Sequence, residues 1–395
     1  MTIDKDIIKI SFTGDLMCEL PLLRECKNFD FSNIALPIKS TYNSDYVVSN
    51  LETVFAGKDK KYTDDVYSFN SPDSFLNVVK ESQIDLVSTA NNHCLDRGVE
   101  GLNRTIKLLN QNKIEHTGTF TKYQDDNFLI KKINGCNVGF ISYTYGTNYA
   151  INKVLLSKDQ EFAVNILKDQ TSGYIPRKGI INKLKDNLLK TETRIKLKKL
   201  LKMQYNFPRT DKINSGDINE RLLSNMDYSI IKAKEKSDIL FILLHVGGQF
   251  NPEPGEFSKY ITNRIHKNAE CFIVGNHPHI VQKSSFDNSV FTAYSLGNYL
   301  ISMESEYIIP ENNPELSIIL HFYIKNKSIS KINYSVAFIN KDNNRTRIND
   351  VYEYSLNHEI TSDFKKNIEK ICTVFSGKSF GNSFELKKEY NIGAF

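Results

Sequence analysis

The chain alternates short hydrophobic runs with segments whose apolar residues recur at helical spacing. Five of the runs are rich in β-branched or aromatic residues, and each ends in polar side chains. They are IIKISFTGD (7–15), SDYVVSNLE (44–52), IDLVSTANNH (84–93), SDILFILLH (237–245) and ECFIVGNHPH (270–279). Such runs predict buried strands of a parallel sheet, which presents polar groups from the carboxyl ends of its strands.

Two segments between these runs predict amphipathic helices. In SPDSFLNVVKESQ (71–83), Ser71 is the expected N-cap and Pro72 the first helical residue. A second helix is expected over 98–112. Its predicted buried face consists of Leu102, Ile106 and Leu109.

A hairpin and a C-terminal group of elements complete the prediction. The dipeptide Asn134–Gly135 favours a two-residue turn between strands at 127–133 and 137–145. A helix followed by a strand is expected within 219–245. After Met303 we expect strands at 316–324 and 329–338 and a helix near 362–375. The alternation of strands and helices indicates an α/β protein.

Residues 151–225 are polar and basic, and they predict an insertion into this pattern. The basic residues are Arg177, Lys178, Lys183, Lys185, Lys190, Arg194, Lys196, Lys198, Lys199 and Lys202. Two interpretations stay open. The insertion is either a solvated helical face packed on the main domain, or a lid or cationic guide for an acidic substrate.

The composition is that of a soluble globular protein. With 395 residues, the chain is long enough for one large domain with additions or for two domains. Its formal net charge of +5 gives weak support to an anionic substrate and none to a nucleic-acid partner.

The cysteines and the N-terminal residues predict a cytoplasmic protein. The six cysteines form no Cys-x-x-Cys pair and no dense framework, which argues against a zinc ribbon or a disulfide scaffold. We therefore expect free thiols in a reducing compartment. The segment MTIDKDIIKISFTGD lacks the hydrophobic region of a signal peptide, and no apolar run reaches the roughly 18 residues of a membrane span.

The polar ends of the predicted strands offer a set of side chains suited to a metal. They are Asp15, Asn50, Glu52, Asn91, Asn92, His93, His245, His277 and His279. Carboxylate, amide and imidazole ligands without a thiolate suit one or two divalent cations such as Mn, Fe, Zn or Mg. Simpler readings are a turn-capping role for Asp15 and a buried structural role for His245.

Eight motifs follow one another along residues 7–303. They are FTGDLM (12–17), SNLET (49–53), STANNHCLDRG (88–98), GLNRTIKLLNQNKIEHTGT (101–119), YTYGTN (143–148), LLHVGG (243–248), GNHPH (275–279) and YSLGN (294–298). Their order and spacing resemble the CapA family of bacterial poly-γ-glutamate capsule synthesis proteins, which are similar to calcineurin-like metallophosphoesterases. The resemblance implies a four-layer αββα metallophosphatase-like sandwich over 1–303, with the basic helical insertion at about 151–225. Residues 304–395 are then a C-terminal extension of strands and a helix packed on it.

The resemblance also implies roles for the residues at the strand ends. The implied metal ligands are Asp15, Glu52, Asn92, His245, His277 and His279, with Glu52 able to bridge two ions. His93 is the implied acid that protonates a leaving oxygen, held in orientation by Asp96. Asn91 is an alternative to Asn92, because sequence cannot orient the turn. Pro278 is expected to keep the backbone extended, so that the histidines on either side project at a fixed spacing.

Other positions are expected to contact substrate or to set the number of ions. The predicted substrate-binding residues are Asn50, Asn91, Tyr145, Ser295 and Asn298. A tight turn is the alternative for the last two. Many metallophosphatases place a histidine where this chain has Met17, a poor ligand for a hard ion. The expected number of ions is therefore one or two.

Two classes of function follow from these expectations. In the first, the protein is a metal-dependent hydrolase of capsule-type or related γ-glutamyl peptide biosynthesis. Its substrate is an anionic phosphate- or carboxylate-bearing compound, small or polymeric. In the second, it is a non-catalytic metal-binding partner of an acidic polymer or of a biosynthetic ligase. Many capsule-synthesis members carry a membrane anchor, which was not found in this sequence.

Overall fold

A computed structural model describes residues 7–35, 38, 43–172, 193, 211–287, 290–306 and 308–394. The basic residues from Arg177 to Lys202 lie outside these ranges. Both interpretations of the insertion therefore stay predictions. All six cysteines lie inside the ranges, and they are buried and free, as expected.

The first sheet contains the strands that begin and end the described chain. Its order is β14-β13-β12-β1-β2-β3-β4, and β11 and β15 pair with β1 and β13 respectively. The strands are β1 (Ile8–Leu16), β2 (Tyr46–Leu51), β3 (Leu86–Ser88), β4 (Glu115–Thr117), β11 (Asn298–Leu300), β12 (Leu316–Lys325), β13 (Ser328–Asp342), β14 (Arg345–Asp350) and β15 (Tyr390–Ala394). β1 is parallel to β2 and antiparallel to β12, so residues after 303 supply a direct neighbour of the first strand. The predicted division at 303 stays a prediction.

The second sheet contains the strand that ends at His245 and the strand that ends just before His277. Its order is β5-β6-β7-β8-β10-β9. The strands are β5 (Leu129–Ile133), β6 (Cys136–Thr144), β7 (Ile239–His245), β8 (Phe272–Asn276), β9 (Ser284–Asp287) and β10 (Val290–Ala293). The predicted hairpin joins β5 to β6. Its turn residues Asn134 and Gly135 both have positive φ, as a type I′ turn requires.

The two sheets pack face to face around one large apolar core. Phe12 of the first sheet lies 4.7 Å from Phe241 of the second, measured between ring centroids. Phe322 of β12 contacts both rings edge-on. The same core includes inward-facing residues of β2, β6, β8 and β10. Alternate residues of each strand point outward, which creates a second apolar face on each sheet.

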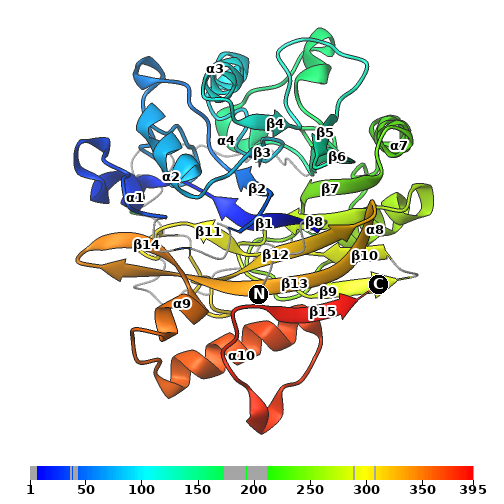
Figure 1. Cartoon of the computed structure of the whole chain (residues 1–395). Coiled ribbons are helices and arrows are strands. Elements are labelled where there is room, and N and C mark those ends of the chain that lie inside the picture. The colour runs from blue at the N-terminus through cyan, green and yellow to red at the C-terminus, as the bar shows by residue number, and fades with distance from the viewer. Residues whose placement is uncertain are drawn as a thin grey trace.

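Helices cover these outer faces (Figure 1). On the first sheet lie α1 (Leu20–Glu25), α2 (Leu76–Glu81) and α3 (Gly98–Gln111), and on the second lie α7 (Glu220–Glu235) and α8 (Glu256–Asn268). The short α4 (Tyr149–Asn152) follows β6, and α9 (Val351–Ser355) and α10 (Ser362–Ser376) form the group drawn in orange at the opposite end from α3. The predicted four-layer αββα sandwich is confirmed.

One predicted helix start is wrong. Residues Asp73–Phe75 form a 3-10 turn before α2, and Ser71 does not cap either segment. Its hydroxyl instead bonds Thr53 at 2.7 Å. The three residues predicted on the buried side of α3 are all buried.

A buried ion pair links the first strand to the last. Lys9 Nζ lies 2.9 Å from Glu389 Oε1, and their side chains are 10% and 18% exposed. Glu389 also accepts hydrogen bonds from Tyr323 and Asn333. Although burial opposes the charged form, neighbouring positive charge and these bonds hold the pKa of Glu389 at about 2.

We expect Glu389→Gln to lower the free energy of unfolding at pH 7 by about 2–3 kcal/mol, because it removes the carboxylate charge that the folded state stabilises. The folded-state pKa lies below the ordinary value of 4.5. The wild-type advantage should therefore shrink as pH falls from about 4.5 towards 2. Urea unfolding across this range measures it, with Glu385→Gln, an exposed carboxylate, as control. A constant difference across the range would contradict the assignment.

Candidate metal centre

The strand ends of both sheets bring the predicted ligands together. β1 and β2 deliver Asp15 and, one residue past the strand, Glu52, while β7 ends at His245. His245 Nε2 lies 3.4 Å from Glu52 Oε1 and 3.1 Å from Nδ1 of His277. His279 Nδ1 lies 3.4 Å from Asp15 Oδ2. The side chains predicted from separate strands therefore form one cluster.

Close backbone packing fixes the end of β1. A Cβ on Gly14 would lie 2.0 Å from the carbonyl oxygen of Gly297, so this position requires glycine. The next residue, Asp15, donates its own N–H to the same carbonyl at 3.0 Å. Its carboxylate accepts from the His277 N–H at 3.0 Å and from the Asn50 amide at 2.7 Å. Asp15 is thus held by backbone and side chain in one orientation.

Two groups of three residues have the spacing of metal ligands. The first is Asp15, Glu52 and His279, and the second is Glu52, His245 and His277. Within each group the ligand atoms lie within 4.8 Å of one another. Glu52 belongs to both groups, which is the position of a bridging carboxylate.

The surroundings of Glu52 fit a bound cation. This carboxylate is fully buried, and neither of its oxygens has a hydrogen-bond partner among the described residues. Nitrogen atoms of His93, His245 and His279 lie 3.4–3.9 Å from its Oε1. Ligands about 2.1 Å from a shared ion lie about 3–3.4 Å apart, close to these separations. Because a buried carboxylate without compensation is costly, the donor set fits a divalent ion.

Burial and nearby charges shift the pKa values of two histidines of the cluster in opposite directions. Although burial opposes protonation, Glu52 and Asp15 raise the pKa of His279 to about 9. Burial and the neighbouring His245 lower the pKa of His277 well below its ordinary value. One histidine of the cluster thus holds a proton at neutral pH, in a place that a metal cation can take.

The backbone around Pro278 differs from the prediction. His277 and His279 have φ values of +102° and +58°, so the chain bends at both histidines and is not extended. Positive φ is strained for residues with a Cβ, and such strain is typical of functional sites. The two rings nevertheless face the same cluster, with centroids 5.8 Å apart.

The turn after β3 settles which asparagine faces the cluster. Asn92 Oδ1 lies 2.7 Å from His245 Nε2. Asn91 instead donates to the carbonyl of Leu51 at 2.7 Å and accepts from the His93 N–H at 3.1 Å. The geometry favours Asn92 as the metal-facing amide. Asn91 is buried and bonds the backbone of the turn, and its role as a substrate contact stays a prediction.

His93 is oriented as the sequence predicted. Its Nδ1 lies 2.5 Å from Asp96 Oδ2, and its Nε2 lies on the side of Glu52, at 3.9 Å from Oε1. Phe69 stacks on the ring with centroids 4.0 Å apart. The N–H of Phe69 also donates to Asp96. The imidazole is therefore held by a hydrogen bond and by an aromatic face.

Most of the predicted substrate-binding residues form hydrogen bonds within the protein. Ser295 donates to the backbone carbonyl of Ile280 at 2.7 Å. Asn298 lies against His279 through its Oδ1 and, through its amide, bonds the carbonyl of the same residue. These side chains and Asn50 are buried and bond other residues of the protein. Their role as substrate contacts stays a prediction.

Tyr145 differs, because it is partly exposed and packs its ring 4.9 Å from His277. Its substrate role stays a prediction.

Sequence reasoning missed Asn148 and the aromatic lining of the cluster. The amide nitrogen of Asn148 lies 3.1 Å from His93 Nδ1, and its Oδ1 accepts from the Asn92 amide, also at 3.1 Å. It ends the motif YTYGTN, which was the available signal. Phe250 lies near His279, and with Phe69 and Met17 it belongs to one apolar group. Met17 therefore packs beside the cluster in an apolar environment.

Fold and cluster together define a two-sheet α/β protein with a candidate divalent metal centre. The chain matches the family model described as bacterial capsule synthesis protein PGA_cap over residues 9–303. It belongs to this family, which confirms the resemblance predicted from the motifs.

The chain is similar to two curated members. One is the PGA biosynthesis protein CapA of Bacillus subtilis (strain 168), 21% identical over 305 residues, or 76% of this chain and 64% of that protein. The other is the capsule biosynthesis protein CapA of Bacillus anthracis, 22% identical over 262 residues, or 65% and 51%. The chain therefore spans only about half to two-thirds of their length.

Among solved structures, a 5'-nucleotidase from Candida albicans SC5314 aligns with 92% of this chain and 57% of its own, at 13% identity and a TM-score of 0.37. Within the residues that the structure describes, no helix combines the length and apolarity needed to cross a bilayer. The compartment stays a prediction.

Proposed function

We propose that this protein is a metal-dependent hydrolase of capsule-type or related γ-glutamyl peptide biosynthesis. Its substrate carries a phosphate or a γ-glutamyl-type carboxylate. The observation that carries the proposal is the buried carboxylate of Glu52. It has no hydrogen bond among the described residues, and two ligand groups share it. Membership of the capsule synthesis family supports the biosynthetic setting.

The residues divide into those that hold metal and those that handle a proton. Asp15, Glu52 and His279 would hold one ion, and Glu52, His245 and His277 a second, with Asn92 beside the second group. Bound Mn, Fe, Zn or Mg would supply an acidified water and charge neutralisation for an anionic oxygen. His93 would donate a proton from Nε2 to a leaving oxygen, with Asp96 fixing the orientation of the ring through Nδ1.

Burial of the cluster favours a second candidate function. The six proposed ligands are at most 3% exposed. A metal enclosed in this way could stabilise a non-catalytic protein that binds an acidic polymer or a biosynthetic ligase. Metal removal separates the two functions. Loss of turnover with little change in melting temperature supports the enzyme, whereas unfolding without any detectable turnover supports the binding protein.

The direct test is a metal analysis followed by an activity screen. The metal-loaded protein is assayed with phosphoesters and γ-glutamyl peptides, each with the metal-stripped protein alongside. The proposed function predicts stoichiometric metal and turnover that returns with it. A protein that binds no divalent ion would contradict both candidate functions.

We expect metal affinity to rise with pH. Because the pKa of His279 is raised to about 9, its proton competes with the ion below that pH. Affinity should increase by up to about tenfold per pH unit from pH 7 to 9 and then level off. Calorimetry in buffers of different ionisation enthalpy should detect about one proton released per site at pH 7.5. An affinity that does not depend on pH would contradict the charge state.

A further inference from the structure

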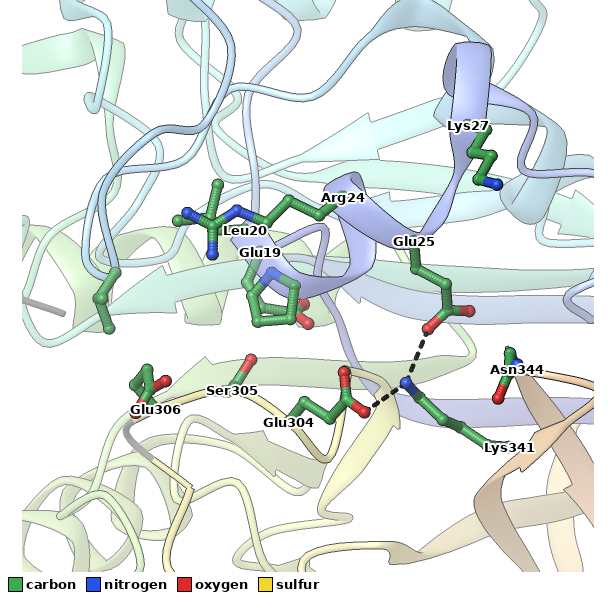
Figure 2. Close-up of a pocket in the computed structure, with 12 residues that line it drawn as sticks. Glu19, Leu20, Arg24, Glu25, Lys27, Glu304, Ser305, Glu306, Lys341 and Asn344 are labelled. Carbon is green, nitrogen blue, oxygen red and sulfur yellow. Dashed lines mark ion pairs between the residues drawn. The ribbon is translucent and has the colours of Figure 1, made fainter. Parts of the chain in front are cut away.

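A second site lies beyond the end of the strand that carries Asp15. A cavity of about 550 Å³ opens between α1, residues 304–306 and the end of β13 (Figure 2). Its volume is within the range of small-molecule sites. None of the proposed metal ligands or proton-handling residues lines it. It is therefore a separate feature that the proposed function does not use.

The enclosed end of the cavity is formed by Glu19 and Ser305. Glu19 is 1% exposed, and its Oε1 accepts from the Ser302 N–H at 2.7 Å. Its Oε2 and the hydroxyl of Ser305 are buried, and neither has a hydrogen bond of normal geometry among the described residues. Burial raises the pKa of Glu19 to about 7, although the nearby Ser305 hydroxyl favours the charged form of its carboxyl. Among the described residues, no ion pair to Glu19 accompanies its hydrogen bond from Ser302.

Opposite charges line the rest of the cavity. Lys341 lies between Glu304, at 2.5 Å, and Glu25, at 3.6 Å (Figure 2). In total, four glutamates and three cationic side chains line the space. Because carboxylates outnumber cations in this lining, a strongly anionic ligand fits it poorly. A ligand with both charges matches the mixture.

Apolar side chains complete the wall and indicate what joins the two charges. Leu20, Pro21 and Val66 line the cavity between the charged groups. An aliphatic segment would bury apolar surface against them. Figure 2 shows the Glu19 carboxyl on the side of α1 that faces Ser305 and Glu304.

We propose that this cavity binds a small zwitterionic amine, a free amino acid or short peptide, with its ammonium group on Glu19 and Ser305. The carboxylate of the ligand then faces Lys341, and an aliphatic side chain lies on Leu20 and Val66. A charge-assisted hydrogen bond from the ammonium group satisfies the buried carboxyl. Glu19 lies three residues after the end of β1, the strand that carries Asp15 of the metal cluster.

Calorimetry on the full chain tests the proposal. L-leucine and the dipeptide Leu-Gly are titrated beside their N-acetyl forms, which keep the carboxylate and lose the ammonium. We expect at least one free amine to bind and its N-acetyl form to bind at least about tenfold more weakly. Glu19→Gln should cause a similar loss. Glu100→Gln, an exposed carboxylate outside the cavity, should change nothing.

Three results would overturn the proposal. They are no binding of either free amine at millimolar concentration, equal binding of the acetylated forms, and unchanged affinity in a folded Glu19→Gln protein. Thermal unfolding establishes that the variant is folded. If it is not, Ser305→Ala is measured in the same way, with the same loss expected. Metal content is not part of the readout, so failure here is separate from failure of the proposed metal centre.

Discussion

Glu52→Gln should abolish stoichiometric metal binding, whereas His277→Ala should lower the affinity for one of the two ions. Glu52 belongs to both ligand groups, so its replacement removes a charged ligand from each. The loss should exceed the roughly 10–100-fold fall in affinity that is typical of replacing a residue that only supports a ligand. Metal content after dialysis, measured by mass spectrometry, checks the prediction.

A matched control for this experiment is Glu19→Gln. Glu19 is as buried as Glu52 but lies outside both ligand groups. Its replacement should leave metal content unchanged. Retention of both ions by the Glu52 variant would show that the carboxylate is not a ligand.

His93→Ala should lower turnover about 10²–10⁴-fold while metal content stays near the wild-type value. The expected range is that of a positioned acid or base. The His93 ring is held by Asp96 and stacked on Phe69, which fixes where its proton is delivered. Parallel measurement of kcat and bound metal checks the prediction with any substrate found in the screen.

Two further variants define the role of His93. Asp96→Asn should lower kcat less than His93→Ala and shift the pH–rate profile, because the ring remains but loses its charged partner. His358→Ala, which changes an exposed histidine after the end of α9, should have no effect. Loss of metal in the His93 variant would instead make this residue a ligand.

The sequence predicted where ligands would gather but not how they would be held. Strand-like runs end in unmistakable polar residues, and parallel strands bring such ends together, so the cluster followed from pattern alone. β3 ends at Ser88, three residues before Asn91. The turn that follows Ser88 points the side chains of Asn91 and Asn92 in different directions, and no periodicity in the sequence predicts these directions. For the same reason, the positive φ values of His277 and His279 could not be predicted from the sequence.

The hydrogen bonds that support the histidines could not be predicted from the sequence either. Asn298 and Asn148 reach their histidine partners from segments 19 and 55 residues away along the chain. The same residue types occur in ordinary turns, so only the fold distinguishes a structural amide from one that contacts substrate. The cavity beside Glu19 joins three such distant segments, and no local motif indicates it.

The position of β1 also has a consequence for how the chain acquires its structure. This strand pairs on one side with β2 and on the other with β12, whose first residue is Leu316. One edge of β1 therefore stays open until about 300 further residues have been synthesised. Such non-local pairing slows folding and exposes unpaired strands to aggregation. We expect slow refolding from denaturant and a need for chaperones during synthesis, with β12 docking as a late event.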